Sequence, residues 1–180
     1  MAKRRPKRDP LQRIYCFPPI IDNDCHILVL GTMPGNESLY HNKYYAHPKN
    51  LFWDYMYRIL IPDYDFLQPV DMNVSFEERY GLLLKNHIAV WDVLSDCLRD
   101  GSSDSTITEK VYNTMADFIE DSKIKVIFCN GKPAFDFLKE SGEMEQLKVP
   151  VIKLGSSSTS NHNNPFATLK HWREQFHASL

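Results

Sequence analysis

Short apolar runs alternate along the chain with longer segments in which apolar residues recur at helical spacing. The apolar runs contain β-branched residues and are short enough for strands buried on both faces. They cover residues 26–31, 88–91, 124–129 and 149–154. The segments with helical spacing cover residues 51–60, 76–85, 107–121, 133–141 and 165–177. This alternation predicts an α/β fold with a mostly parallel sheet that is covered by helices on both faces.

Two local signals refine the predicted helices. Ser75 followed by Glu78 has the spacing of a capping box, which predicts that a helix begins just after Ser75. Pro48 is suited to the first position of a helix, because its fixed backbone angle matches the helix and it has no N–H to leave unpaired. We therefore expect the helix that contains residues 51–60 to begin near Pro48.

The charges are unevenly distributed although their sum is small. The 180 residues contain 21 Lys and Arg against 23 Asp and Glu, a net charge of −2 that excludes a uniformly basic nucleic-acid-binding protein. Residues 1–13 nevertheless carry six basic side chains and one acidic side chain. Because Pro6 and Pro10 break any helix there, we predict a flexible basic tail, either a solubilising terminus or an arm that contacts phosphates. Residues 14–180 are predicted to form a single domain.

Several classes of protein lack the sequence signal that they require. No run of about 18 apolar residues is present, and the basic start is not followed by the apolar segment of a secretory signal. No CxxC pair, HExxH pattern or GxSxG motif occurs. We therefore expect an intracellular protein without membrane association or a metal site. Its thiols are expected to be reduced; they are Cys16, Cys25, Cys97 and Cys129.

Polar and glycine-containing segments follow the predicted strands, at the edge of a parallel sheet where binding sites form. The turn Gly31–Gly35 follows the first strand, and its glycines allow backbone N–H groups to bind a carbonyl or phosphate oxygen. An ordinary strand-ending turn is the alternative. Asp92 follows the second strand, and residues 130–132 follow the third. Residues 155–161 after the fourth strand are small and polar, typical either of a surface linker or of a loop that approaches a ligand closely.

The segment from Tyr44 to Trp53 combines aromatic, imidazole and amide side chains at the start of a predicted helix. The Asn50 amide is suited either to bind a nearby backbone group or to orient a water molecule. His47 is suited either to cap the helix or to donate to a ligand. Tyr45 precedes the helix, so the core does not require its burial.

These segments together resemble the uracil-DNA glycosylase superfamily, most closely its hypoxanthine-DNA (deoxyinosine) glycosylase branch and next its mismatch-specific uracil/thymine glycosylases. The resemblance covers nearly the whole chain and rests on an ordered set of motifs. The motifs are Phe17–Ile20, Leu30–Gly35, Tyr44–Asn50 with Phe52–Trp53, Ala89–Leu94 with Cys97, Arg99 and Gly101–Ser102, Phe128–Gly131, and the serine-rich loop ending at Asn161.

The resemblance implies a three-layer α/β/α sandwich with a four-stranded central sheet, and it implies hydrolytic removal of a deaminated base from DNA without a cofactor. Asn50 matches the catalytic residue of the deoxyinosine branch, and Tyr45 matches the ring that stacks on the flipped base. Met33 stands where mismatch-specific relatives have a water-positioning Asn. The implied base-binding residues are Gly31, Thr32, Met33, Pro34, Gly35, Tyr45 and His47. The implied DNA-binding residues are Ser156, Ser157, Ser158, Thr159, Ser160 and Asn161.

The expected partner is DNA that contains hypoxanthine, uracil or both, bound by a monomer. Lys43, Lys49, Lys132 and the basic tail are candidates for local phosphate contacts, which would make the small net charge tolerable. Two other functions stay open at this point. One is a hydrolase of similar fold that acts on free nucleosides, and the other is a non-catalytic module that only binds nucleic acid.

Overall fold

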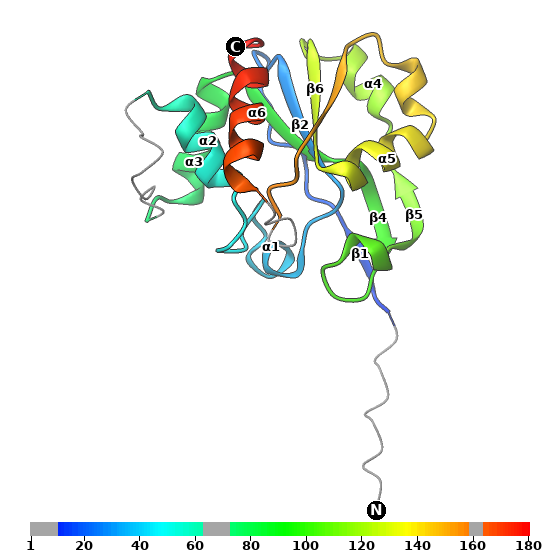
Figure 1. Cartoon of the computed structure of the whole chain (residues 1–180). Helices are drawn as coiled ribbons and strands as arrows, with labels where there is room; N and C mark the ends of the chain where they lie inside the picture. The colour runs from blue at the N-terminus through cyan, green and yellow to red at the C-terminus, as the bar shows by residue number, and fades with distance from the viewer. Residues whose placement is uncertain (1–10, 63–72, 159–163) are drawn as a thin grey trace, which may run out of the picture.

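A four-stranded parallel sheet forms the centre of the molecule (Figure 1). The computed structural model describes residues 11–62, 73–158 and 164–180. The strands of the sheet lie in the order β3-β2-β6-β7, and each neighbouring pair is parallel. Their bounds are β2 (Ile27–Gly31), β3 (Ile88–Asp92), β6 (Val126–Asn130) and β7 (Val151–Leu154). The four predicted strands and their parallel arrangement are thus confirmed.

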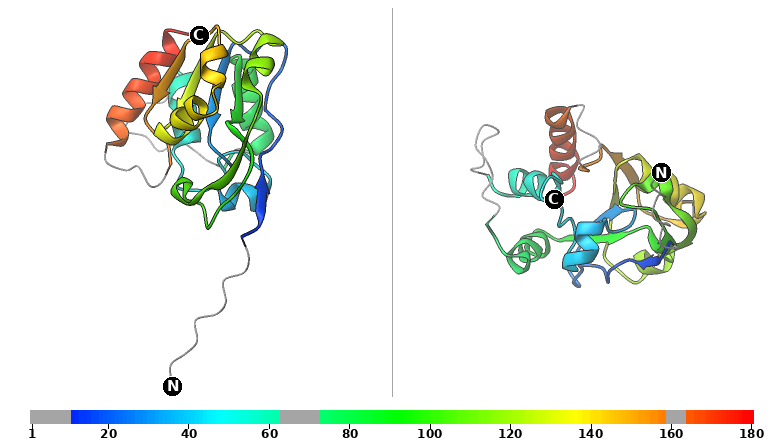
Figure 2. Two further views of the ribbon diagram at one scale, coloured as in Figure 1. Left: turned by 90° about the vertical axis from the view of Figure 1, so that its right-hand side faces the viewer. Right: turned by 90° about the horizontal axis from the view of Figure 1, so that it is seen from below.

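Helices cover both faces of this sheet, which confirms the three-layer α/β/α architecture. One face carries α2 (Phe52–Leu60), α3 (Phe76–Lys85) and α6 (Pro165–His177). The other carries α4 (Met115–Glu120) and α5 (Lys132–Glu140). Figure 2, seen from below, separates the two groups of helices on opposite sides of the sheet.

Strand β2 shows why continuous apolar sequence produces this layering. Successive strand residues point to opposite faces, so Ile27 and Val29 join the core beneath α2, α3 and α6. Leu28 and Leu30 join the separate core beneath α4 and α5. All four side chains are fully buried. A strand buried on both faces needs apolar residues at every position, and this requirement makes its sequence a run rather than an alternation.

A second, three-stranded antiparallel sheet was not predicted. It has the order β1-β4-β5 and consists of β1 (Arg13–Tyr15), β4 (Leu94–Leu98) and β5 (Thr108–Tyr112). The prediction of one helix over residues 107–121 was therefore wrong in its first half, since α4 begins only at Met115. The strand β5 lies at the edge of its sheet with Thr108, Glu109 and Val111 exposed, and such a strand lacks a continuous apolar run.

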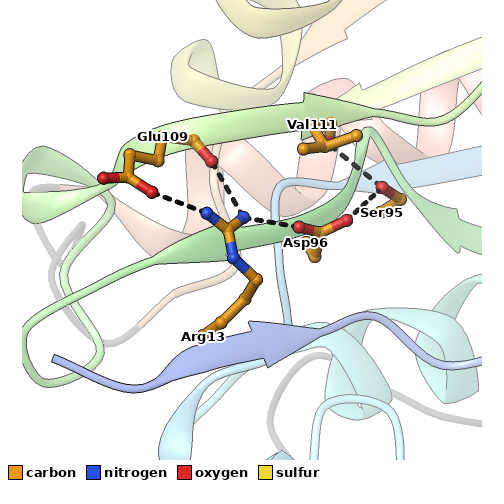
Figure 3. Close-up of polar contacts among 5 residues, drawn as sticks. All are labelled: Arg13, Ser95, Asp96, Glu109 and Val111. Carbon is orange, nitrogen blue, oxygen red and sulfur yellow. Dashed lines mark hydrogen bonds and ion pairs between the residues drawn. The ribbon is translucent and has the colours of Figure 1, made fainter.

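Arg13 connects the three strands of this small sheet (Figure 3). Its guanidinium donates to Asp96 Oδ1 on β4 over 2.6 Å and to Glu109 Oε2 on β5 over 2.7 Å. Arg13 itself pairs with Leu98 in the β1–β4 register. The predicted tail, residues 1–13, therefore extends too far, because Arg13 belongs to the fold. Residues 1–10 lie outside the described part of the chain.

The starts of two helices test the local predictions. The predicted capping box before α3 is confirmed: Glu78 N–H donates to Ser75 Oγ, and the Ser75 N–H donates to the Glu78 carboxylate. The expectation for Pro48 was wrong, because α2 begins at Phe52. The remaining short helices are α1 (Asn36–His41), η1 (Asp104–Thr106) and η2 (Glu143–Gln146).

Candidate active site

A pocket of about 160 Å³ lies at the carboxyl edge of the parallel sheet, where β2, β3 and β6 end at Gly31, Asp92 and Asn130. This is the edge at which parallel sheets bind ligands. The pocket contains every predicted site residue that the structure describes. These residues are Gly31, Thr32, Met33, Pro34, Gly35, Tyr45, His47, Asn50, Ser156, Ser157 and Ser158.

The Asn50 side chain is held in one orientation. Its Oδ1 atom accepts hydrogen bonds from the Phe52 backbone N–H and from the Ser157 hydroxyl, each over 2.9 Å. Because a backbone N–H can only donate, the atom facing it must be the amide oxygen and not the nitrogen. Oδ1 thus binds a backbone group at the start of α2, as one of the two sequence-based alternatives expects. That the amide orients a water molecule stays a prediction.

Ser157 links the Asn50 amide to the end of β6. Its backbone N–H donates to Asn130 Oδ1, and Asn130 Nδ2 donates to Ser157 Oγ, each over 2.9 Å. The hydroxyl therefore accepts from Asn130 and must donate its own proton to Asn50. The Ser157 carbonyl accepts the Leu51 N–H over 2.9 Å. Ser157 is fully buried, and its hydroxyl positions the Asn50 amide. The DNA contact that the resemblance implies for Ser157 stays a prediction.

Tyr45 has a strained backbone and a partly buried ring. Its φ of 52° lies in the left-handed region, which costs a residue other than glycine roughly 1–3 kcal/mol. The ring stacks on Phe52 with centroids 3.9 Å apart and planes 15° apart. The Tyr45 hydroxyl is buried without a hydrogen-bond partner among the described residues, and burial raises its pKa.

Asp92 is the second buried polar group in the wall of the pocket. Only 4% of the residue is exposed, and Oδ2 has no hydrogen-bond partner in the described part of the chain. Burial raises the pKa of Asp92 to about 7, the nearby Asp104 carboxylate adds to this effect, and Arg99 opposes it. A side chain on Gly31 would not fit beside this group, because a Cβ there would lie 2.6 Å from Asp92 Oδ1 and 3.1 Å from the Tyr45 hydroxyl.

The turn Gly31–Gly35 is fixed to the loop that follows β4. Arg99 is buried and donates to the Pro34 carbonyl over 2.6 Å and to the Gly101 carbonyl over 2.9 Å. The Thr32 hydroxyl donates to Asp104 Oδ1 over 2.9 Å. These contacts hold the turn in a single conformation, as a preorganised binding site requires.

The sequence model of the family described as "Uracil DNA glycosylase superfamily" matches residues 18–177. The chain belongs to this superfamily. It is 31% identical to a "Hypoxanthine DNA glycosylase" of Methanosarcina barkeri over 170 residues, which cover 89% of this chain and 96% of that protein. It is also 31% identical to a "Hypoxanthine DNA glycosylase" of Methanosarcina acetivorans over 122 residues, which cover 67% of this chain and 73% of that protein.

The fold is also similar to a solution NMR structure of a "putative Uracil DNA glycosylase" from Methanosarcina acetivorans. The TM-score is 0.75 at 27% identity, with 93% of this chain and 98% of the other covered. The protein is therefore a DNA glycosylase, an enzyme that hydrolyses the bond between a base and its sugar, and DNA is its substrate.

Several other predicted residues of this glycosylase can now be placed. His47 is exposed, and its Nδ1 accepts the Lys49 N–H over 3.1 Å, so it closes the turn before α2 rather than capping the helix. Met33 is 6% exposed and packs with Leu94 and Cys97 while lining the pocket. Thr159, Ser160 and Asn161 lie outside the described residues.

Two of the lysines predicted to contact phosphates have acidic neighbours. Lys43 pairs with Glu77 over 3.2 Å, and Lys132 pairs with Asp136. Exposed ion pairs of this kind contribute little to stability, so a phosphate can replace the carboxylate at small cost. The lysine contacts with DNA stay predictions.

Asp92, Asp104 and Asn130 belong to the pocket although they were not chosen as site residues from the sequence. Asp92 and Asn130 are the last residues of β3 and β6, and this position at strand ends was the available signal. Asp104 lies in the polar segment of residues 100–106, whose composition is typical of a surface loop. Within residues 11–62, 73–158 and 164–180, no group of three or more His, Cys, Asp or Glu side chains could hold a metal ion. No helix in these ranges is long and apolar enough to cross a membrane.

Proposed function

We propose that this DNA glycosylase removes hypoxanthine from DNA by hydrolysing the N-glycosidic bond of a deoxyinosine that has been flipped out of the duplex. The observation that carries the proposal is the fixed Asn50 amide. Its oxygen is occupied by Phe52 and Ser157, so its amino group is the part of the side chain available in the pocket. The relatives named hypoxanthine DNA glycosylase support the choice of base.

Flipping is required because the reacting sugar carbon and the base edge are inaccessible inside a stacked duplex. The cost is a few kcal/mol and is smallest for a mispaired base such as hypoxanthine. The Tyr45 ring, supported from one side by Phe52, lines the pocket that would receive the base. Stacking on an aromatic ring contributes about 1–3 kcal/mol per base.

The chemistry needs positioning more than a strong base. As the bond from the sugar C1′ to the base breaks, C1′ gains positive charge and the base leaves with the electron pair. A water held by Asn50 Nδ2 attacks C1′ and releases its proton to solvent. An uncharged amide suffices, because the electron-poor C1′ accepts a neutral nucleophile. Backbone N–H groups of the turn Gly31–Gly35 would stabilise the charge that develops on the departing base.

The decisive experiment offers the enzyme duplexes that each contain one inosine, uracil or mispaired thymine, in excess EDTA, followed by hot alkali to cleave abasic sites. We expect strand cleavage at inosine that grows with time. Tight binding to the inosine duplex without cleavage would instead indicate a non-catalytic binding module. Cleavage of free deoxyinosine but not of the duplex would indicate a nucleoside hydrolase. Activity that is lost in EDTA and restored by a divalent ion would contradict the cofactor-free mechanism.

Uracil is the second candidate base, favoured by the superfamily description and by the similar solution structure. Uracil presents the same adjacent N–H and C=O groups as hypoxanthine, but it has a single ring where hypoxanthine has two fused rings. Single-turnover excision rates, measured on uracil and inosine duplexes of otherwise identical sequence, would rank the two bases. A faster rate on uracil would reverse the proposed preference.

A further inference from the structure

One aromatic side chain beside the pocket has no part in the proposed chemistry. Tyr40, on the short helix α1, is 84% exposed, more than any other large hydrophobic side chain among the described residues. A single exposed aromatic ring is common on protein surfaces and indicates no function by itself. The position of Tyr40 relative to the pocket is what gives this ring a role.

Helix α1 continues the wall of the pocket. Its first two residues, Asn36 and Glu37, line the pocket. Residues four apart lie on the same face of a helix, so Tyr40 and His41 lie one turn further along this face. The four side chains of the face are exposed, whereas Ser38 is buried. The Tyr40 ring therefore lies at the rim of the pocket, roughly 6 Å along the helix axis from the lining residues.

Hydrogen bonds fix α1 to the pocket, and Figure 1 shows this helix below the strands of the central sheet. The Asn36 N–H donates to Ser102 Oγ over 2.9 Å, and Ser102 is itself a pocket residue. The Ser38 hydroxyl, which also lines the pocket, accepts the Ala46 N–H over 3.2 Å. The position of α1, and with it that of Tyr40, is thus fixed relative to the pocket.

The charges on this face of α1 favour an uncharged part of the DNA. The Glu37 carboxylate lies 3.6 Å from His41 Nε2, the basic group in the last turn of the helix. A carboxylate repels a phosphate group, which makes contact with the DNA backbone unfavourable here. The Tyr40 ring, which contacts the His41 ring edge-on with centroids 4.9 Å apart and planes 88° apart, offers a flat apolar surface instead. Nucleic acid bases stack on such surfaces.

We propose that Tyr40 stacks on the base next to the lesion in the damaged strand and covers the face that the flipped base has left. Flipping breaks the stacking between the lesion and its neighbours, which is part of its cost. A ring that covers the exposed face of one neighbour restores part of this stacking and stabilises the flipped state. The inference rests on the base flipping of the proposed function, but not on which base is removed.

The test measures binding to a duplex that carries a tetrahydrofuran abasic analogue, which leaves the neighbouring base uncovered without any excision. We expect Tyr40→Ala to weaken this binding about 5- to 100-fold, as loss of a stacking ring does, and Tyr40→Phe to bind like the wild type. Binding to the undamaged duplex should be unchanged in both variants, because no base face is uncovered there. The Tm of Tyr40→Ala should equal that of the wild type, because the ring is exposed.

Tyr15→Ala is the matched control, because it also removes an exposed tyrosine. Tyr15 belongs to β1, none of whose residues lines the pocket. This variant should bind both duplexes like the wild type.

A second readout places 2-aminopurine beside the abasic analogue, on each side in turn, because stacking quenches its fluorescence. At saturating protein, the wild type and Tyr40→Phe should quench it on one side, and Tyr40→Ala should not. Equal affinity of Tyr40→Ala and the wild type for the abasic duplex would overturn the inference. So would an equal loss of affinity for the undamaged duplex, because Tyr40 would then contact intact DNA. If the wild type cleaves no lesion duplex while Tyr40→Ala loses affinity for the abasic duplex alone, the proposed function fails and the role of Tyr40 stands.

Discussion

The Ser157 hydroxyl donates a hydrogen bond to Asn50 Oδ1 over 2.9 Å, joining residues that are 107 positions apart in the sequence. The Asn130 amide donates to the same hydroxyl. Two backbone N–H groups, those of Phe52 and Ser157, fix the orientation of the two amides. The direction of every hydrogen bond in this chain is therefore defined, and the atoms of Asn50 have separate tasks.

Replacing Asn50 by Asp and by Ala should separate those tasks. Asp keeps an oxygen for the Phe52 N–H and the Ser157 hydroxyl but loses the amino group, so Asn50→Asp should lower excision on the order of 10²–10³-fold with a near-normal Tm. Asn50→Ala should lose the same activity and also about 0.5–1.5 kcal/mol of stability, because the Phe52 N–H at the start of α2 loses its acceptor. Single-turnover rates and thermal unfolding of both proteins provide the check. Normal excision by Asn50→Asp would show that the amino group has no catalytic role.

Ser157→Ala should reduce activity through Asn50 and not through DNA binding. Loss of the hydroxyl removes the acceptor of Asn130 Nδ2 and leaves Asn50 Oδ1 with the Phe52 N–H alone, which costs about 1–3 kcal/mol of stability. We expect a lower excision rate in the bound complex and an almost unchanged Kd for the inosine duplex. Ser122→Ala, which removes a hydroxyl bonded to the Ile119 carbonyl far from the pocket residues, is the control for a purely structural effect. A weakened Kd with a normal rate would return Ser157 to a DNA-binding role.

Gly31→Ala should inactivate the enzyme, because the new methyl group would lie 2.6 Å from Asp92 Oδ1 and 3.1 Å from the Tyr45 hydroxyl. Both contacts are too short, so the pocket wall must move. Gly81→Ala in α3 is the matched control: its Cβ meets nothing within 4 Å, and alanine should stabilise the helix by up to about 1 kcal/mol. Excision assays and thermal unfolding on the pair should show opposite effects, and equal activity of both variants would contradict the close approach.

Stability should fall as the pH rises from about 4 to about 7. The pKa of Asp92 is raised from 3.8 to about 7 in the folded state, so over this range the folded protein binds more protons than the unfolded chain. The contribution to the slope is up to roughly 1.4 kcal/mol per pH unit. Asp104, whose pKa burial also raises, acts in the same direction. Urea unfolding at several pH values should give a shallower slope for Asp92→Asn than for the wild type, and identical slopes would contradict the raised pKa.

Deletion of residues 2–10 should leave the Tm unchanged, because β1 and the contacts of Arg13 remain. If the basic side chains in this segment contact phosphates, the deletion weakens binding to every duplex. The dependence of log K on log salt should then become shallower by about 0.9 per lost phosphate contact. Titrations of duplex binding at several salt concentrations test this expectation. If the slope of log K against log salt does not change, the segment is only a solubilising terminus.

The central sheet could be predicted because burial on both faces imposes an unmistakable run of apolar residues, as in β2. The strand β5 could not, because one of its faces is exposed and its charged residues fit a helix equally well. The same contrast holds in the pocket. Asn50 and Tyr45 lie in a distinctive segment, whereas Asp92 and Asn130 gain their importance only from what the fold places beside them. No local sequence pattern shows that Asp92 will be buried next to the Asp104 carboxylate and the Cα of Gly31.

The hydrogen-bonded chain from Asn130 through Ser157 to Asn50 also has a consequence for the growing polypeptide. Asn50 is synthesised before the serine that helps to fix its amide, since Ser157 follows β7. A chain that stops before residue 157 keeps the Phe52 N–H beside Asn50 but lacks the Ser157 hydroxyl that completes the positioning of the amide. The ability to cut a base from DNA is therefore acquired only after residue 157 has been synthesised, and chains that stop earlier should be inactive on DNA.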